Sequence, residues 1–466
     1  MTTTFQNPKG TRDFYPEDLL RRRYITEQWR AASVRHGFEE IDGPTFEHAA
    51  LYTVKSGEGI LSELFSFTRE GGDDLYALRP EFTPTLARLY AAKAASLPKP
   101  VRWFCIPNFF RAEKPQRGRL REFVQWNCDV LGSEDDAPAD ADVVGCLVGS
   151  MEAMGVSDRV VRVQCSARPA GEALLKRAGV TDARMDEAFA LLDRWAKLDD
   201  AARSAQSAAI GLDHDAFERD AQRVRAGERV EGLELGPIGA LAERVGGSWI
   251  GVEPAVVRGL AYYTGLIFEV LAEGERAVAG GGRYDKLVEL FGGPATPACG
   301  FGMGDVVLAN LLDDHGLFPA GEELRDAIDR VVRSVSLRPE VFVVSGAQEH
   351  DGLVGPLVAR LRRGVESSSY RGREGAKPWD ADRYEGDGVR PLHARVTSKT
   401  TRNLKKLLAE AEKMGAKTAA IVHGPDKVQL KDLRTREDVG DFAVDATTSN
   451  ALGAVRYVGD AIAERV

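Results

Sequence analysis

The sequence predicts an α+β protein followed by a smaller α/β domain. Two observations indicate the first part: residues 104–131 form two strand-like runs joined by a basic turn, and residues 61–80 form a second hairpin pattern between helical segments. The third observation is that strand and helix patterns alternate from Glu340 onward, as in α/β domains. We therefore expect domains at 1–325 and 339–466, joined by a connector at 326–338.

Composition limits the classes of protein to consider. With 43% hydrophobic and 29% charged residues, the 466-residue chain is typical of soluble globular proteins. No apolar run is long enough to span a bilayer, and the first residues do not resemble a signal peptide, so we expect a cytoplasmic protein with no membrane partner. The five cysteines are scattered and never form C-x-x-C, which argues against disulfides and zinc. A net charge of −9 argues against general nucleic-acid coating but permits a local basic patch.

Helical spacing and turn residues define the remaining elements of the first domain. Pro44 closes a short strand that we place at an edge or an interface, because proline cannot donate in a ladder. Glu81 or Thr83 could cap the helix that follows them. The expected elements are helices at 17–36, 81–95, 140–154 and 306–312, strands at 38–47, 160–165, 257–271 and 277–285, and an inserted helical module at 170–245.

The hairpin at 104–131 carries the first candidate site. Residues 122–131 alternate with a period of two, which marks a strand whose faces meet different surroundings. One side is apolar throughout, whereas the other carries Gln125, Asn127 and Asp129, a pattern that suggests a polar ligand site. The turn at 113–121 concentrates basic side chains, and guanidinium groups bind phosphate oxygens in pairs. The alternative is an exposed hairpin with solvated charges.

Glycines and basic residues mark the rest of the chain. Residues 280–282 are three glycines, which let a backbone approach a neighbour closely. Glycines 300, 302 and 304 could suggest a dinucleotide loop and hence an oxidoreductase, but they lack the required spacing. The second domain should hold strands at 341–345, 416–423 and 427–433. It should also hold a helix that ends at 363, a closing helix at 451–464 and a surface insertion at 365–394. A basic helix beginning at Thr397 is most simply a solvated face.

In their order and spacing these motifs resemble histidyl-tRNA synthetases, a class II aminoacyl-tRNA synthetase family. The matching segments are 9–14, the strand ending at Pro44, 78–83, 109–111 with its loop, 258–263 and 280–285. The resemblance implies a catalytic domain with a mixed, mostly antiparallel sheet flanked by helices, and a C-terminal α/β anticodon-binding domain. It also implies a homodimeric ligase that activates L-histidine with ATP and transfers it to tRNA-His.

The same resemblance assigns roles to individual residues. Arg111 and Arg258 match the catalytic arginines at the α-phosphate. The implied histidine site is Glu81, Phe82, Thr83, Arg111, Gln125, Asp129, Arg258, Tyr262 and Tyr263. The implied ATP site is Arg111, Glu113, Arg119 and Phe123, to which we add Arg283, and the implied acceptor-stem contacts are Gln116 and Arg117. Mg²⁺ should accompany ATP by bridging phosphate oxygens, so we expect no protein metal site.

Two positions depart from the family pattern. Val307 stands where the third class II motif usually carries an arginine for the γ-phosphate, and we expect Arg283 to compensate. Ala261 replaces a usual aspartate, which should retune its neighbourhood. The missing arginine also fits an alternative from a different class, a catalytically silent paralogue that acts as a histidine-binding regulatory subunit.

Overall fold

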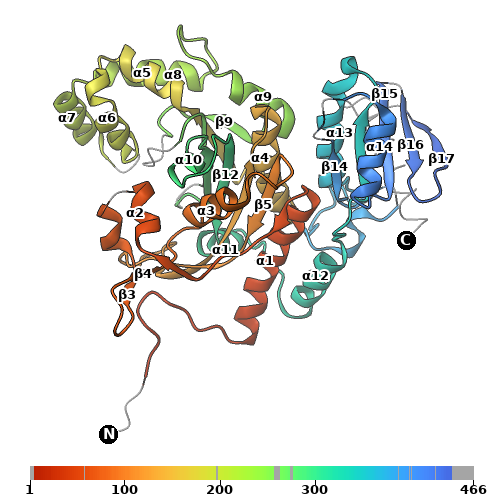
Figure 1. Ribbon diagram of the computed structural model, residues 1–466, viewed down its shortest axis with the longest axis horizontal. Coiled ribbons are helices and arrows are strands. Elements are labelled where there is room, and N and C mark those ends of the chain that lie inside the picture. The colour runs from red at the N-terminus through yellow and green to blue at the C-terminus, as the bar shows by residue number, and fades with distance from the viewer. Residues whose placement is uncertain are drawn as a thin grey trace. The chain divides into compact units, whose positions relative to one another are not determined.

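The computed structural model describes residues 5–442, apart from 57, 196–197, 257–262, 273–275, 387, 398, 400 and 426 (Figure 1). The chain divides into two compact units. The first comprises residues 1–13, 41–143 and 158–311, and the second comprises 14–40, 144–157 and 312–466. Segments 14–40 and 144–157 therefore group with the C-terminal part of the chain, which the sequence patterns did not predict.

A large sheet forms the centre of the first unit. The strands that the first unit contributes follow the order β5-β7-β12-β11-β10-β8-β9, and β6 pairs with β7. Every pair is antiparallel except β8 with β9, so the predicted mostly antiparallel sheet is confirmed. The bounds are β5 (Val101–Cys105), β6 (Asn108–Phe110), β7 (Glu122–Leu131), β8 (Val161–Ala167), β9 (Ile250–Val252), β10 (Leu266–Ala272), β11 (Ala279–Arg283) and β12 (Ala298–Gly304).

Helices and a small second sheet surround this central sheet. The small sheet has the order β2-β4-β3. One core cluster buries aromatic side chains from α3, from β6 and from residues next to α3 and β11: Phe82, Tyr90, Phe109 and Tyr284. The bounds are β2 (Phe46–His48), β3 (Ser66–Thr68), β4 (Leu75–Leu78), α2 (Ala50–Ser56), η1 (Glu58–Glu63), α3 (Thr83–Lys93), α4 (Asp136–Ala153), α10 (Leu287–Leu290) and α11 (Asp305–Asp314).

Helices occupy the segment predicted to be helical at 170–245. They share a core of their own around Phe189, Trp195 and Phe217. Asp199 and Asp213 cap two of them by accepting a backbone N–H in the first turn. In Figure 1 this group runs from yellow to green. The helices are α5 (Arg168–Arg177), η2 (Asp182–Arg184), α6 (Met185–Leu192), α7 (Asp200–Ile210), α8 (His214–Arg225) and α9 (Gly236–Val245).

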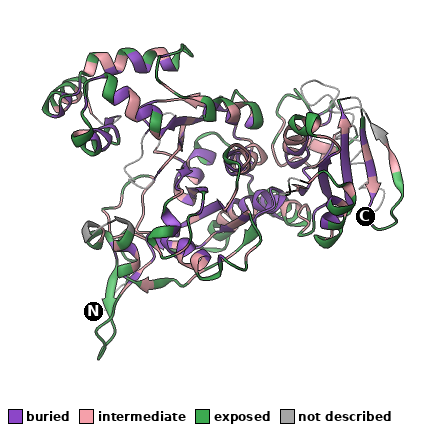
Figure 2. Ribbon diagram, turned by 45° about the horizontal axis from the view of Figure 1, so that its top comes forward, coloured by how far each residue is buried: buried purple, intermediate pink, exposed green. Residues whose placement is uncertain are grey.

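The second unit contains a five-stranded sheet with the order β14-β13-β15-β16-β17. Its first three strands are parallel and the last two pairings are antiparallel. β13 and β15 are buried almost throughout (Figure 2), as expected for central strands covered on both faces. The five strands are β13 (Val341–Ser345), β14 (Ala394–Val396), β15 (Thr418–Gly424), β16 (Lys427–Asp432) and β17 (Asp438–Phe442), and the short strand β1 (Glu39–Glu40) is not part of this sheet. The helices are α1 (Pro16–Arg35), α12 (Gly321–Arg333), η4 (Gln348–His350), α13 (Asp351–Arg363), η5 (Ala381–Tyr384) and α14 (Leu404–Lys413).

Three expectations for the second unit need correction or stay untested. The basic helix begins at Leu404 rather than at Thr397, because the side chain of Asn403 caps it by accepting from Lys406 N–H. Strands β14 and β17 were not predicted, since both are short or weakly apolar. The expected helix at 451–464 lies outside the described residues.

The predicted insertion is anchored at its base. Val365 and Val389 form an antiparallel bridge, and both side chains are buried. Between them Tyr370 is also buried, and Arg383 pairs with Glu366 at 2.7 Å. The segment thus contributes to the core of the second unit, which its polar composition did not indicate.

Candidate active site

Strand β7 has the two-sided character that its sequence predicts. One side is packed: no side chain among Val124, Trp126, Cys128 and Val130 is more than 5% exposed. The Trp126 ring packs edge-on against Phe301, with 4.7 Å between the ring centres. Polar side chains occupy the other side. The period-two alternation therefore separates a packed core face from a polar face.

Glycines on the neighbouring strand make room for the polar side chains of β7. In the antiparallel register Gly300 lies opposite Asp129, and Gly304 lies opposite Gln125. A Cβ at Gly300 would collide with the Asp129 carboxylate, and one at Gly302 would lie 2.7 Å from Gln125 Nε2. These glycines belong to strand β12, so the dinucleotide-loop interpretation is wrong. They allow the β7 side chains to lie across the sheet surface.

The polar face is an ordered hydrogen-bond system. Gln125 Nε2 donates to Asn127 Oδ1 at 2.9 Å, and Asn127 and Asp129 are each 5% exposed. The Tyr284 hydroxyl, just after β11, donates a short hydrogen bond to Asp129 Oδ1. Burial raises the pKa of Asp129 to about 7, although the Tyr284 hydrogen bond lowers it. The face therefore presents a carboxyl group that changes its charge near neutral pH.

The turn between β6 and β7 holds the basic side chains close to this strand. Gly118 has a φ of +72°, which favours glycine, and Gln116 and Arg119 bridge the turn. Arg119 forms a close ion pair with Glu113, whose other oxygen, Oε2, is buried without a hydrogen-bond partner in the described part of the chain. Gln116 and Arg117 are exposed at the tip. The turn thus offers an unused buried acceptor beside a cluster of cations.

Arg111 joins the turn to the segment before α3. Its Nε donates to the carbonyl of Pro80 at 3.0 Å, and its guanidinium lies 5.0 Å from the ring centre of Phe123. Glu81 directly follows Pro80, and the first turn of α3 begins at Thr83 with Phe82 at the N-cap. Neither Glu81 nor Thr83 is therefore the capping residue of this helix. The fold brings these predicted residues together from segments about thirty positions apart.

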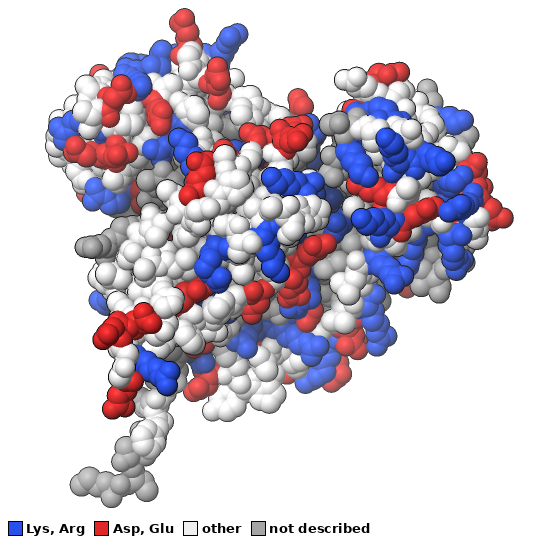
Figure 3. All heavy atoms as spheres, viewed as in Figure 1, with Lys and Arg blue, Asp and Glu red and all other residues white. Residues whose placement is uncertain are grey.

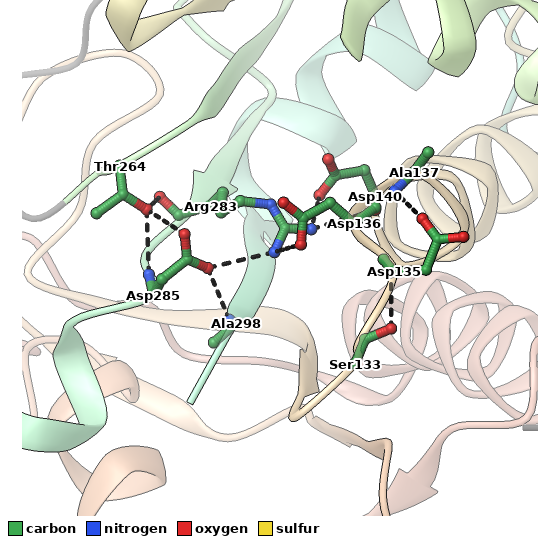
Figure 4. A network of polar contacts seen from close by, with 9 residues as sticks. All are labelled: Ser133, Asp135, Asp136, Ala137, Asp140, Thr264, Arg283, Asp285 and Ala298. Atoms are coloured by element: carbon green, nitrogen blue, oxygen red, sulfur yellow. Dashed lines mark hydrogen bonds and ion pairs between the residues drawn. The ribbon is translucent and has the colours of Figure 1, made fainter. Parts of the chain in front are cut away.

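Arg283 lies in a buried ion-pair network instead of facing a ligand (Figure 4). It is 4% exposed and reaches Asp136 at 2.8 Å, Asp140 at 2.7 Å and Asp285 at 3.2 Å. Burial raises the pKa of Asp140 to about 6, although Arg283 lowers it. Thr264 completes the network by donating to Asp285 at 2.7 Å. Three carboxylates occupy the guanidinium, which contradicts the expectation that Arg283 compensates for Val307 at the ATP phosphates.

The glycine-rich segment accommodates a further predicted residue. Tyr263 is 6% exposed, and a Cβ at Gly282 would lie 2.8 Å from its ring. Arg258, Ala261 and Tyr262 lie outside the described residues. Within the described ranges no three His, Cys, Asp or Glu side chains gather into a metal-binding group.

Sequence reasoning missed three contributors to the site. Asn127 belonged to the alternating pattern but was given no role, and Tyr284 stood unassigned in the glycine motif. Asp305 gave no signal in the sequence. Its two carboxylate oxygens accept from Val124 N–H at 3.0 Å and from Arg12 at 2.6 Å, so it fastens the N-terminal segment to β7.

The mostly antiparallel sheet, its polar strand and the arginine-bearing turn before that strand agree with the catalytic domain expected of a class II aminoacyl-tRNA synthetase. The comparisons with known proteins are more specific. The model of one family, Histidyl-tRNA synthetase, matches residues 10–305, and this chain belongs to that family.

Relatives and solved structures agree with this assignment. The chain is 38% identical to "Histidine--tRNA ligase" of Opitutus terrae over 69% of this chain and 78% of the relative. It is 30% identical to "Histidine--tRNA ligase" of Thermococcus kodakarensis over 92% of this chain and 94% of the relative. The crystal structure of histidyl-tRNA synthetase from Nostoc sp. PCC 7120 has the same fold, with a TM-score of 0.57 at 19% identity and full coverage of both chains. Among the helices of the described residues, none is long and apolar enough to cross a membrane.

Proposed function

We propose that this protein activates L-histidine with ATP and transfers it to tRNA-His in the cytoplasm. One observation carries the proposal: the largely buried Gln125–Asn127–Asp129 face and the Arg111–Arg119 turn belong to one strand and its adjoining loop. The first supplies hydrogen bonds for a small polar ligand, and the second supplies cations for a nucleotide. Membership of the histidyl-tRNA synthetase family supports histidine as that ligand.

The histidine site is proposed to lie on the polar face of β7. Asp129 would accept from an imidazole N–H, and Gln125 would bind beside it. Glu81, Phe82 and Thr83 would surround the amino group, while Tyr262 and Tyr263 would border the ring. A site built to hydrogen-bond its substrate rejects analogues that lack the matching group. The buried carboxyl of Asp129 supports this specificity, because burial makes an unmatched partner costly.

The nucleotide is proposed to bind across the turn. Phe123 would stack on adenine, the free Glu113 Oε2 would accept from the adenine amino group, and Arg119 would contact the phosphates. Arg111 and Arg258 would hold the α-phosphate while a histidine carboxylate oxygen attacks its phosphorus. The phosphorus–oxygen bond to pyrophosphate then breaks. Fixed cations placed where negative charge develops lower the barrier to such a step.

Metal and tRNA contacts complete the proposal. Mg²⁺ would bind the phosphate oxygens of ATP and travel with the nucleotide. A ribose hydroxyl at the 3′ end of tRNA-His would attack the histidyl carbonyl and release AMP, with Gln116 and Arg117 near the acceptor stem. In the second unit Lys and Arg side chains are numerous around α13 and α14 (Figure 3), and the exposed Lys405 and Lys406 support an anticodon-side contact there.

A homodimer is also proposed. Exposed aromatic side chains gather on the small sheet: Phe46 is 48% and Phe67 42% exposed, and their rings lie 5.6 Å apart. Tyr76 contacts both rings. An exposed apolar cluster of this kind marks a protein–protein contact. Phe46 itself lies in β2, two residues after Pro44, in the segment that was expected at an edge or an interface.

The test is histidine-dependent ATP–pyrophosphate exchange by the purified protein without tRNA. Robust exchange with histidine, and none with other amino acids, would support the proposal. The alternative is the histidine-binding regulatory subunit. A solved Bacillus halodurans protein titled "ATP phosphoribosyltransferase regulatory subunit/histidyl-tRNA synthetase" has the same fold, with a TM-score of 0.55 at 21% identity. Calorimetric histidine binding without exchange would favour that alternative.

A further inference from the structure

The side chain of Arg276 lies against the basic turn between β6 and β7. Arg276 precedes β11, far from the turn in the sequence. A Cβ built on Gly118 would lie 3.3 Å from Arg276 Cδ and 3.1 Å from Val307 Cγ2. The side chains of Arg276 and Val307 therefore meet at the same point of the turn. Arg276 is half-buried there and follows the gap at 273–275 in the described chain.

Arg276 differs from neighbouring arginines in having no carboxylate partner among the residues that the structure describes. Arg119 pairs with Glu113, Arg12 pairs with Asp305 at 2.6 Å, and Arg283 has three carboxylates. No carboxylate of the described residues lies within 4.0 Å of Arg276. Burial and the nearby positive charge of Arg119 lower the pKa of Arg276, although the carboxylate of Glu113 raises it. Within the described part of the chain, Arg276 is thus a second cation beside Arg119, and the nearby carboxylate of Glu113 is already paired with Arg119.

An arrangement of this kind is unfavourable until an anion binds. Two like charges in a partly desolvated place repel, and desolvation adds to that cost. A polyphosphate would relieve both effects, because guanidinium groups form charge-assisted hydrogen bonds with its oxygens. Val307 is apolar and cannot make such bonds.

We propose that Arg276 binds the distal phosphates of ATP, and those of pyrophosphate in the reverse direction. It thereby supplies from the β10–β11 connection the positive charge that Val307 does not supply from α11. The inference rests on the proposed function for the identity of the nucleotide. It replaces Arg283, whose guanidinium is enclosed by carboxylates, as the compensating residue.

The experiment compares Arg276→Gln and Arg276→Lys with the matched control Arg229→Gln. Arg229 is exposed on the helical module, and its side chain makes no hydrogen bond or ion pair with the described residues. In ATP–pyrophosphate exchange we expect R276Q to raise the KM values for ATP and for pyrophosphate about tenfold or more, the size of losing one charged hydrogen bond. The KM for histidine should change less than twofold. R276K keeps the positive charge, so its KM values for ATP and pyrophosphate should rise less than those of R276Q. R229Q should match the wild type.

Calorimetry separates this inference from the proposed function. R276Q should weaken the binding of ATP about tenfold and leave the binding of AMP, which lacks the distal phosphates, unchanged. Unchanged ATP binding, or equal loss of ATP and AMP binding, would overturn the role of Arg276. Absence of exchange by the wild type would instead refute the proposed function, while the ATP and AMP titrations still decide on Arg276.

Discussion

Replacing Asp129 by Asn should stabilise the protein while removing its activity. The pKa of this buried carboxyl is raised from 3.8 to about 7, so the folded state binds a proton more tightly than the unfolded state. Stability from this group is therefore present below pH 4 and is lost as the pH rises through about 7. Asn does not titrate, has nearly the same shape, and its Oδ1 can still accept from Tyr284.

The size of the stability gain in D129N follows from the pKa values of Asp129 in the unfolded and folded states, 3.8 and about 7. Their difference of about 3 pH units, at about 1.4 kcal/mol per unit, corresponds to about 4 kcal/mol at pH 8. At pH 5 less than half of this difference has developed. The advantage of D129N over the wild type should therefore grow by roughly 2 to 3 kcal/mol between pH 5 and pH 8.

Urea denaturation at several pH values, followed by tryptophan fluorescence, provides the measurement. Trp126 is fully buried on the opposite face of β7 and reports on this unit. The matched control is D142N, because Asp142 pairs with Arg102 at 2.8 Å and its loss should bring no gain. Histidine-dependent exchange should be lost in D129N. A stability difference that stays constant between pH 5 and pH 8 would refute the reasoning.

Two further predictions concern neighbours of Asp129. Tyr284→Phe removes a hydrogen bond that lowers the pKa of Asp129, so this pKa should rise. The acidic limb of the pH profile of ATP–pyrophosphate exchange should then move to higher pH, and a profile with an unchanged acidic limb would contradict this prediction. Arg283→Met leaves the buried Asp140 unpaired and should cost roughly 3 to 5 kcal/mol in thermal unfolding, with the KM for ATP little changed. A variant of normal stability with a raised KM would instead return Arg283 to the phosphates.

Local patterns predicted part of this site well. The polar face of β7 was predictable because a period of two in a strand separates its sides regardless of the partner strands. The glycines of β12 were ambiguous, since alternating glycines are compatible with a phosphate-binding loop and with a strand that makes room for a neighbour. Only the register of β12 against β7 shows that they accommodate Gln125 and Asp129.

Long-range partners were not predictable. Arg283 was expected at the phosphates, but the carboxylates that enclose it include Asp136 and Asp140, well over a hundred residues earlier in the chain. Arg276 had no local pattern to distinguish it from a solvated surface arginine. Its position at Gly118 depends on how the β10–β11 connection meets the turn. Burial and pairing are tertiary properties, so residue type alone placed one arginine wrongly and overlooked the other.

The proposed site has two halves: the polar face of β7 for histidine, and Arg119 with Arg276 for the phosphates of ATP. The energetic cost of the second half helps to decide between a ligase and a regulatory subunit. A protein that only senses histidine needs the polar face of β7 but gains nothing from a half-buried Arg276 beside Arg119. Keeping that cation with no carboxylate partner among the described residues destabilises the empty protein, because its charge is partly desolvated and is repelled by Arg119. A nucleotide that brings several negative charges turns the same arrangement into binding energy. The two halves can be separated experimentally, because R276Q should weaken ATP binding about tenfold while histidine still binds, and D129N should abolish histidine binding while ATP still binds.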